Sequence, residues 1–547
     1  MTRLAILLAL FLATGRTPGA TPAASATRNP EVTAPHGMVA SAHALASQAG
    51  LELLRAGGNA VDAAAAAAFA VGVVEPNASG IGGEGMLVLY RADTREAVAV
   101  DYRSTAPATA AYPGRVPSTG HSAVAVPGTV AGLALAVERY GTKSLAEVMA
   151  PAIRLARDGF VASPTLAGIV ADSFEELAAN APLASVFCPD GLPVEAGATV
   201  KNPDLATTLE KIARYGPDVF YRGGIAEAIV AESAANGGFL SRSDLAGYRA
   251  ILREPVRGKY RGVTVLSGPP PVGGTPVIEA LQILDRFRVR KGRPLAPETV
   301  HAVAESLKRA YADYHAFVAD PGFVAVPLDR LLSRAYAKRR AKEVDRNRMT
   351  AKVVAGEVPR DPGPSTTSLV VADRHGNLVS LTQTISDFFG AKVMVAGTGI
   401  ILNNEMKNFS ARGVNAMAPG KRMRTLIAPT VLLRGSKPFA VLGTPGGPRI
   451  SATTVLLVSN LVDHDMPVQE AIEAPRYYAR DTEKDLAVES RFPKETREAL
   501  ASLGYTFQEM KDYDLFFGGA QAIVIDRRTG NRAGGADPRR DGTVSGY

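Results

Sequence analysis

Two neighbouring threonines, Thr366 and Thr367, are the residues of this chain best suited to covalent chemistry. They follow Pro364-Ser365 and precede a run at 369–373 that alternates like a β-strand. A Thr at the tip of a hairpin could become a nucleophile if the chain were cut before it, because its freed α-amine would lie beside the hydroxyl as a base. A Ser-Thr-Thr sequence after proline is more often only a turn that leads into a strand. Whether Thr366 is a nucleophile or only a turn residue depends on whether the chain is cut before it.

The segments around these threonines predict how they would be positioned. Residues 369–373 and 378–384 are typical of two strands joined by the turn His375-Gly376-Asn377. Residues 354–367 are rich in Pro, Gly and charge, which is the composition of an exposed linker. An accessible linker that ends at Thr366 is what a processing site would need.

The remaining patterns predict two β-rich layers with helices outside. We expect helices at 41–56, 59–74, 297–342, 453–462 and 468–474, a mostly helical region at 144–284, and strands at 86–90, 97–102, 260–267, 430–434, 439–443 and 520–526.

Length and composition limit the classes of function. With 547 residues, the chain is long enough for two lobes or one large α/β unit. The net charge of +8 is spread along the chain without an aromatic-rich basic module, so we expect no nucleic-acid partner. Cys188 is the only cysteine, which excludes an intrachain disulfide and makes a cysteine metal site implausible.

Residues 1–26 have the features of a secretory signal peptide. Arg3 supplies a positive start, residues 4–13 form a short apolar core, and Ala24-Ser25-Ala26 fits a cleavage site. No other stretch is long and apolar enough for a stable membrane span. We therefore expect a secreted protein, located in a bacterial periplasm or cell envelope.

Many short motifs occur along the chain in an order and spacing that is very specific. They are Gly37-Met38-Val39-Ala40-Ser41, Gly57-Gly58-Asn59-Ala60-Val61-Asp62-Ala63-Ala64, Val74-Glu75-Pro76, Ser79-Gly80-Ile81-Gly82-Gly83, Val126-Pro127-Gly128-Thr129-Val130-Ala131-Gly132, residues 269–274, Asn403-Asn404, Pro445-Gly446-Gly447, Gly534-Gly535-Ala536-Asp537-Pro538-Arg539 and Gly546-Tyr547. Through these motifs the chain resembles the γ-glutamyltranspeptidase family.

This resemblance implies a fold and a maturation step. Members of the family are N-terminal-nucleophile hydrolases of the α+β class, with a four-layer αββα sandwich. Their precursor cuts itself before a Thr, which here places the cut between Ser365 and Thr366. The expected products are a large subunit, 27–365, and a small subunit, 366–547, that remain together as a heterodimer.

The resemblance also implies a role for each matching residue. Thr366 would be the nucleophile, Thr384 would orient it, and the backbone N–H groups of Gly446 and Gly447 would hold the oxyanion. Arg103 would clamp the substrate α-carboxylate. Outside the family, the same residues could be a strand residue, a turn and a surface cation. Neither the residues nor the family imply a metal or an organic cofactor.

The residues expected to bind substrate depart from the family pattern. Ser386 stands where Asn is usual, and Asn408 stands where Asp is usual, although Glu405 still suits an ammonium group. Thr425-Leu426 replaces a Ser-Ser pair, which removes one hydroxyl. Other departures are Ser368 in place of a His, Arg424 as an extra charge, and a segment between Ser410 and Lys421 too short for the family's lid loop.

The resulting expectation is a self-processing γ-glutamyltransferase or glutathione hydrolase-like enzyme that works through an acyl-Thr intermediate. It would pass the acyl group of a small γ-glutamyl substrate to water, an amino acid or a peptide. The first alternative is a glutaryl- or cephalosporin-type acylase that has less need for the α-amino group. The second, from another class, is an inactive family member that acts as a scaffold or binding protein.

Overall fold

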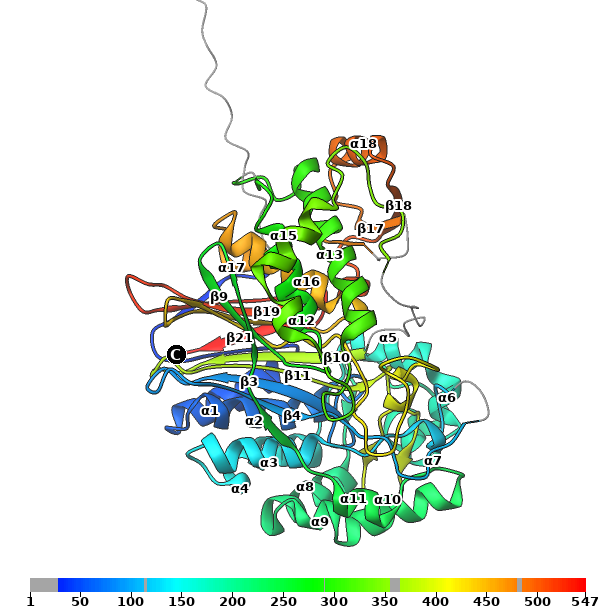
Figure 1. Cartoon of the computed structure of the whole chain (residues 1–547). Coiled ribbons are helices and arrows are strands. Elements are labelled where there is room, and N and C mark those ends of the chain that lie inside the picture. Colours follow the sequence, from blue (N-terminus) through cyan, green and yellow to red (C-terminus); the bar gives the residue numbers. More distant parts are fainter. Residues whose placement is uncertain (1–27, 113–115, 290, 355–364, 480–484) are drawn as a thin grey trace, which may run out of the picture.

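Two β-sheets lie face to face, with helices over the outer face of each sheet (Figure 1). The computed structural model describes residues 28–112, 116–289, 291–354, 365–479 and 485–547. The first sheet has seven antiparallel strands in the order β21-β2-β10-β11-β3-β4-β7. Their bounds are β21 (Thr543–Gly546), β2 (Met38–Ser41), β10 (Ser365–Ala372), β11 (Leu378–Ser386), β3 (Glu84–Tyr90), β4 (Ala97–Tyr102) and β7 (Ile251–Arg253).

The second sheet also has seven strands, in the order β1-β20-β19-β15-β14-β9-β8. Their bounds are β1 (Val32–Ala34), β20 (Arg532–Ala536), β19 (Gln521–Ile525), β15 (Lys437–Gly443), β14 (Thr430–Arg434), β9 (Val263–Ser267) and β8 (Val256–Tyr260). The two sheets are joined by apolar packing and by a hydrogen bond of 2.8 Å from Ser380 Oγ in β11 to the Leu442 carbonyl in β15.

Helices complete the two hydrophobic cores. The first sheet is covered by α1 (Ala44–Arg55), α2 (Ala60–Val74), α3 (Thr129–Tyr140) and α4 (Leu145–Asp158). The second sheet is covered by α12 (Gly274–Leu284), α13 (Pro297–Phe317), α16 (Ile450–Val462) and α17 (Val468–Glu473), with α14 (Leu328–Leu331) and α15 (Arg334–Lys342) outside them.

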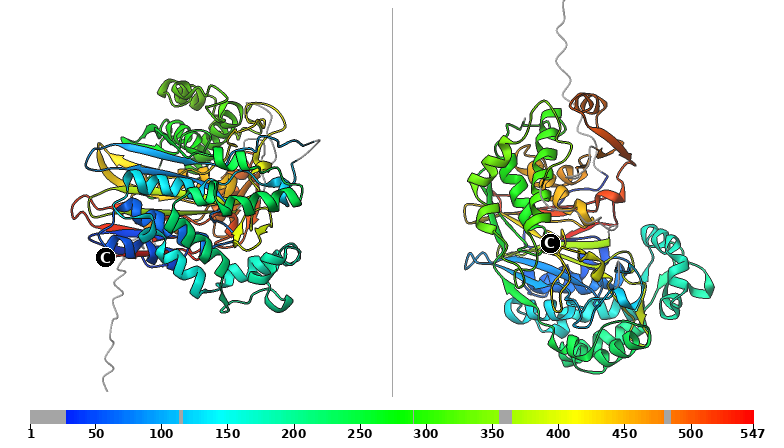
Figure 2. Two further views of the ribbon diagram at one scale, coloured as in Figure 1. Left: turned by 90° about the horizontal axis from the view of Figure 1, so that it is seen from below. Right: turned by 45° about the vertical axis from the view of Figure 1, so that its right-hand side comes forward.

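Two smaller units extend the sandwich. Helices between positions 164 and 247 form a lobe, coloured cyan to green, that projects from the sandwich (Figure 2). They are α5 (Pro164–Asp172), α6 (Phe174–Ala178), α7 (Ala181–Phe187), α8 (Pro203–Tyr215), α9 (Asp218–Tyr221), α10 (Gly224–Ala235) and α11 (Arg242–Gly247). A three-stranded sheet of β16 (Tyr477–Ala479), β17 (Asp485–Glu489) and β18 (Thr506–Met510) carries α18 (Lys494–Ser502). The strand pairs β5 (Phe160–Val161) with β6 (Thr199–Val200) and β12 (Met394–Val395) with β13 (Ile400–Ile401) complete the strand list.

The central helix α2 shows why this sequence forms its elements. Asn59 caps the helix by accepting hydrogen bonds from the N–H groups of Val61 and Asp62, and Asp62 accepts one from the Asn59 N–H in return. Almost every residue of the helix is buried, and most of them are alanines. Small side chains let α2 approach β10 and β11 closely, so the helix gives the middle of the first sheet a firm support.

Most of the expected elements are present, although the strand expected at 260–267 is divided between β8 and β9, and other elements differ at their ends. The helix expected at 41–56 begins at Ala44, because Ser41 belongs to β2 and the side chain of His43 caps the helix. The strand expected at 369–373 begins at Ser365. The prediction that Thr366 and Thr367 belong to a linker is therefore wrong: they lie within β10, which pairs with β11. The rest of that linker, 355–364, and the signal peptide expected at 1–26 lie outside the described residues.

Two further expectations can be compared with the described residues. Among these residues, no helix has both the length and the apolar character needed to cross a bilayer. Cys188 is buried, unpaired and follows α7. The mixed α+β class is confirmed by the two sheets and their covering helices.

Candidate active site

Thr366 lies at an irregular point near the start of β10. Ser365 is opposite Ser386 and Thr367 is opposite Gln383, so the pairing register shifts at Thr366. The buried Thr366 hydroxyl donates to Thr384 Oγ1 over 3.4 Å, and Thr384 Oγ1 accepts the Ser386 N–H over 2.8 Å. The hydroxyls of Thr366 and Thr384, which the family resemblance predicts to act together, are thus in contact.

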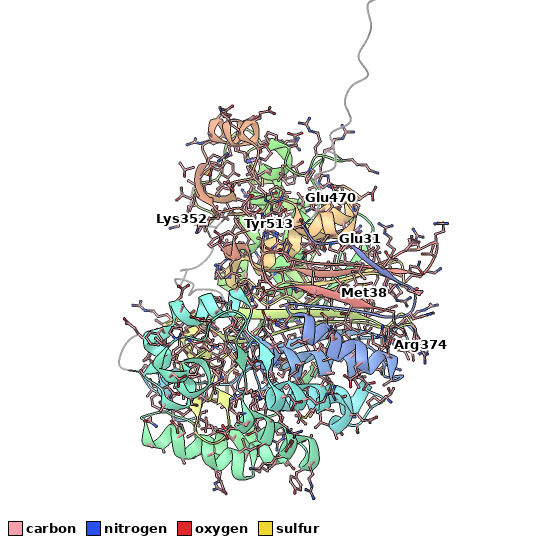
Figure 3. The ribbon with its side chains drawn as sticks, turned by 180° about the vertical axis from the view of Figure 1, so that it is seen from behind. Glu31, Met38, Lys352, Arg374, Glu470 and Tyr513 are labelled. Atoms are coloured by element: carbon pink, nitrogen blue, oxygen red, sulfur yellow. The ribbon has the colours of Figure 1, made fainter. Side chains whose placement is uncertain are left out.

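The threonine pair lies at the open end of the β10–β11 hairpin, not at its tip. The turn of this hairpin contains Arg374, which Figure 3 shows at the edge of the molecule opposite Lys352. The tip position that we expected for Thr366 is therefore wrong. The reason is that β10 extends to Ser365, which places the whole length of the strand between Thr366 and the turn.

Two buried charged residues contact Thr366 and its neighbour Thr367, one through the backbone and one through a side chain. Arg540 Nη1 donates to the Thr366 carbonyl oxygen over 2.8 Å, and the Thr367 hydroxyl donates to Glu75 Oε2 over 2.6 Å. Burial raises the pKa of Glu75, although Arg540 and the Thr367 hydrogen bond oppose this rise. We did not predict either residue as part of the site, although Glu75 belongs to the Val74-Glu75-Pro76 motif.

Gly446 and Gly447 follow β15, where the backbone requires glycine. Their φ angles are 136° and 55°, and Gly447 begins the short helix η4 (Gly447–Arg449) before α16. Residues other than glycine rarely adopt positive φ angles such as these. The strand reaches the pair from Gly443, where an added Cβ would lie 2.2 Å from the Ser368 hydroxyl in β10. The glycine pair therefore follows the point where the second sheet contacts β10 closely.

Ser368 has a structural position in this contact. Its hydroxyl donates to the Leu381 carbonyl of β11 over 3.1 Å and faces Gly443. The space is too small for anything larger than the hydrogen of Gly443. Ser368, which stands in place of the family's His, is thus small enough for the two sheets to lie close together at this point.

Arg103, which follows β4, is the centre of a second buried cluster. Its Nη1 pairs with Glu84 Oε1, its Nη2 lies 3.5 Å from Glu405 Oε2, and Nη2 also donates to the Met423 carbonyl. Burial lowers the pKa of the Arg103 guanidinium. One cation therefore lies between two buried carboxyl groups.

Asn408 connects this cluster to the threonine pair. It ends the short helix η3 (Glu405–Asn408), and its Nδ2 donates to Glu405 Oε2 over 2.6 Å and to Ser386 Oγ over 3.2 Å. Burial raises the pKa of Glu405, and Arg103 opposes that rise. The backbone N–H of Ser386 in turn binds Thr384. The structure thus connects Arg103, Glu405, Asn408, Ser386, Thr384 and Thr366 by successive polar contacts.

Thr425 lies two positions beyond Met423, whose carbonyl binds Arg103. The Thr425 carbonyl accepts a hydrogen bond of 2.6 Å from Tyr314, while its buried hydroxyl has no hydrogen-bond partner among the described residues. The backbone of Leu426 contacts Gly273 closely, and its side chain is buried. Thr425 therefore has a hydroxyl without a partner among the described residues, whereas Leu426 adds only apolar surface.

Arg424 does not add a charge to this pocket, contrary to our expectation. Its guanidinium donates to the His315 carbonyl over 2.9 Å and contacts His315 Nδ1 at 3.2 Å, near the end of α13. Burial and the Arg424 charge lower the pKa of His315 to about 3. Arg424 is held there because carbonyl groups at a helix C-terminus favour a cation.

The segment between Ser410 and Lys421, expected to be too short for a lid, is a loop closed by its own contacts. Lys421 Nζ donates to the carbonyl oxygens of Val414 and Ala416 over 2.7 and 2.8 Å. Absence of a lid over the site stays a prediction.

Comparison with known families adds a finding that is independent of this geometry. A family model described as gamma-glutamyltranspeptidase matches residues 46–547. The chain belongs to the γ-glutamyltranspeptidase family. The resemblance inferred from the sequence motifs is thereby confirmed, and the chain is an enzyme of the γ-glutamyltranspeptidase type.

Full-length relatives of this γ-glutamyltranspeptidase-family chain carry two different names. The chain is 37% identical over 543 residues to a glutathione hydrolase proenzyme of Escherichia coli (strain K12), covering 94% of this chain and 93% of the relative. It is 40% identical over 529 residues to an acylase ACY 1 proenzyme of Pseudomonas sp. (strain SE83), covering 93% of each. A solved structure of a cephalosporin acylase from Bacillus halodurans matches with a TM-score of 0.89 and 33% identity, covering 97% of this chain and 99% of that chain.

Glu84 is the residue of the pocket that sequence reasoning missed. It begins β3 directly after the Gly82-Gly83 pair, and its Oε2 also accepts the Ser104 N–H over 2.6 Å. In the sequence, the preceding Ser79-Gly80-Ile81-Gly82-Gly83 served only as a motif of the family resemblance. An acidic residue between glycines and an apolar strand was the signal that could have identified it.

Proposed function

We propose that the protein cuts its own chain between Ser365 and Thr366 and then transfers γ-glutamyl-type acyl groups through Thr366. The proposal includes a large subunit at 27–365, a small subunit at 366–547 and the four-layer αββα arrangement of N-terminal-nucleophile hydrolases. The observation that carries it is the contact between the Thr366 and Thr384 hydroxyls near the start of β10.

In the precursor, the Thr366 hydroxyl attacks the carbonyl carbon of Ser365. The new C–O bond replaces the C–N bond, and the released amine takes the hydroxyl proton. Water then hydrolyses the ester, which leaves a carboxylate on Ser365 and a free α-amine on Thr366. The shift in pairing register at Thr366 supports this step, because a regular strand would hold the peptide flat in the ladder.

In the mature enzyme, the same hydroxyl attacks the amide carbonyl of the acyl donor. The α-amine of Thr366 takes the hydroxyl proton and passes it to the leaving amine. The N–H groups of Gly446 and Gly447 stabilise the oxyanion, where each such donor is worth roughly 3–4 kcal/mol. Water or an acceptor amine then releases the acyl group, and Thr384 keeps the hydroxyl of Thr366 oriented.

The charge around Arg103 favours γ-glutamyl donors over glutaryl donors. Arg103 already faces Glu84 and Glu405, so the cluster attracts an additional cation such as a substrate α-ammonium. The α-carboxylate would bind Arg103 and the free Thr425 hydroxyl. We assign Glu405, Asn408 and Ser386 to the amino-group side of this pocket.

A glutaryl- or cephalosporin-type acylase is the second candidate. Asn408 supplies no negative charge and Leu426 supplies no hydroxyl. Two groups that would bind the α-ammonium and α-carboxylate of an α-amino acid are therefore missing. The acylase relatives, at up to 40% identity, support this candidate. We therefore expect γ-glutamyl donors to be preferred by less than about a hundredfold, which is the discrimination that incomplete polar recognition allows.

The test begins with a denaturing gel of the purified protein, of Thr366→Ala and of the matched control Thr366→Ser. Wild type and the Ser variant should give two bands, with residue 366 at the N-terminus of the smaller band, and Thr366→Ala should stay whole. An uncut wild-type chain would instead support a scaffold. Values of kcat/KM for γ-glutamyl and glutaryl anilides then decide the substrate: a γ-glutamyl preference above about a hundredfold would exclude the acylase candidate.

We also propose that residues 1–26 direct secretion to a bacterial periplasm or envelope. The supporting feature is the charged, apolar and small-residue order of this segment. Sequencing the N-terminus of the large subunit from cells tests this, since export predicts a start near residue 27.

A further inference from the structure

A buried arginine lies on the backbone of the nucleophile, and the steps proposed above do not use it. Arg540 follows β20 in the C-terminal segment, and its Nη1 donates to the Thr366 carbonyl over 2.8 Å. Its Nε and Nη2 atoms are buried and have no hydrogen-bond partner among the described residues. A guanidinium that is removed from water and bound to one carbonyl is costly, so a functional reason for it is required.

The contact falls where β10 departs from regular pairing. The register shifts between Ser365 and Thr367, and the Thr366 carbonyl is bound by Arg540 at this point. On the other side of Arg540, an added Cβ on Gly519 would lie 2.8 Å from Arg540 Cγ, so the side chain is tightly packed. The arginine is therefore held in one position against the nucleophile's own peptide.

The three charges that act on Arg540 come from two segments. Glu75 follows α2, while Asp537 and Asp541 flank Arg540 in its own segment. Asp537 is already paired with Arg476 and Arg539. Asp541 accepts the Thr165 hydroxyl over 2.9 Å and acts on His43, whose pKa burial lowers. Glu75 binds Thr367 rather than Thr366, so the positive charge is the one in contact with Thr366.

We propose that Arg540 is a positioning residue for Thr366: it holds the Thr366 carbonyl so that the hydroxyl faces Thr384, and its charge keeps the α-amine of the processed enzyme unprotonated. This inference rests on the proposed nucleophilic role of Thr366. The hydroxyl can pass its proton only to a neutral amine. A cation bound to the carbonyl of the same residue disfavours a second cation at the amine.

The consequence is a shift in the acid limb of the pH–rate profile. An ordinary α-amine has a pKa of about 7.7–8.0, so it would be largely protonated at neutral pH. Removal of the Arg540 charge should move the acid limb of kcat/KM to higher pH by about one unit. A purely structural role would lower the activity at every pH without moving this limb.

The test compares Arg540→Met, Arg540→Lys and a control, Arg527→Met, which removes an exposed arginine from the loop after β19. Processing of each precursor is followed on gels, and kcat/KM is measured from about pH 5 to about pH 9 on the processed fraction. We expect Arg540→Met to process at least about tenfold more slowly and to show the shifted acid limb. Arg540→Lys should recover both properties in part, and Arg527→Met should match wild type.

A double variant serves as a control that separates loss of the Arg540 charge from misfolding. Arg540→Met leaves the buried Glu75 without its cation, whereas Glu75→Gln combined with Arg540→Met removes both charges together. The double variant should still show the shifted limb. An acid limb that coincides with wild type in both Met variants, or equal processing rates for the Lys and Met variants, would overturn the inference. A wild-type chain that stays uncut would instead refute the proposed function.

Discussion

The uncharged amide of Asn408 faces the buried carboxyl group of Glu405. Asn408 donates to Glu405 and to Ser386, and its hydrogen bond opposes the rise in the pKa of Glu405 that burial causes, while the amide adds no charge of its own. The bonds from Arg103 to the Met423 carbonyl and from Tyr314 to the Thr425 carbonyl do not depend on this side chain. Residue 408 can therefore change substrate choice without changing the frame of the site.

We predict that Asn408→Asp raises the preference for γ-glutamyl over glutaryl anilide by about tenfold. Two neighbouring carboxylates repel each other unless a cation lies between them, so only a donor with an α-ammonium relieves the new charge. The measurement is the ratio of the two kcat/KM values, with the exposed substitution Asn236→Asp as control. A ratio equal to that of wild type would show that residue 408 does not face the amino group.

At the scale of elements, three helices enclose an acidic pair away from the site. Glu279 in α12 is fully buried, and its carboxyl oxygens have no hydrogen-bond partner among the described residues. Burial raises the pKa of Glu279 well above its ordinary value, and Asp313 in α13 raises it further. Asp313 itself is paired with Arg340 of α15 at 3.0 Å. Burial between these helices thus favours the neutral form of Glu279.

This arrangement makes stability depend on pH with a definite sign. Because the folded-state pKa of Glu279 is raised, its contribution to stability is fully present below the unfolded-state pKa and is lost as the pH rises. We predict that Glu279→Gln raises the melting temperature at about pH 8 and that the gain over wild type shrinks toward about pH 4. The exposed substitution Glu298→Gln, in α13, is the control. A gain that is independent of pH would show that folding does not raise the pKa of Glu279.

At the scale of the whole molecule, each sheet contains strands from both sides of position 366. In the first sheet, β10 and β11 lie between β2 and β3, and β21 pairs with β2 at one edge. In the second sheet, β14 pairs with β9, and β20 pairs with β1. Neither product of a cut before Thr366 could keep a complete sheet by itself.

We therefore predict that the cut protein stays a heterodimer in buffer and unfolds in one transition. Separation would expose the edges of several strands and both apolar cores at once. In size-exclusion chromatography the two fragments should elute together, at the volume of the uncut Thr366→Ala precursor, and should separate only in denaturant. Elution of free fragments in buffer would contradict this prediction.

Local patterns in the sequence were sufficient for much of the fold. The capped, alanine-rich helix α2 and the strands β14 and β15 were predicted because their caps, periodicity and turns lie within a few neighbouring residues. The start of β10 was not, because Ser365 and Thr366 become strand residues by pairing with β11, outside the local sequence. Pairing between distant segments extends a strand beyond what its own composition indicates.

The sequence by itself determined the family, the candidate nucleophile and the residues at which the pocket departs from the family pattern. These features depend on residue types and on their spacing along the chain, and both can be obtained from the sequence alone. Only the tertiary structure decided what each charge does: Arg424 binds a helix end, Glu84 joins Arg103, and Arg540 contacts Thr366. Electrostatic effects depend on distance and burial, and folding alone brings residues 366 and 540 together.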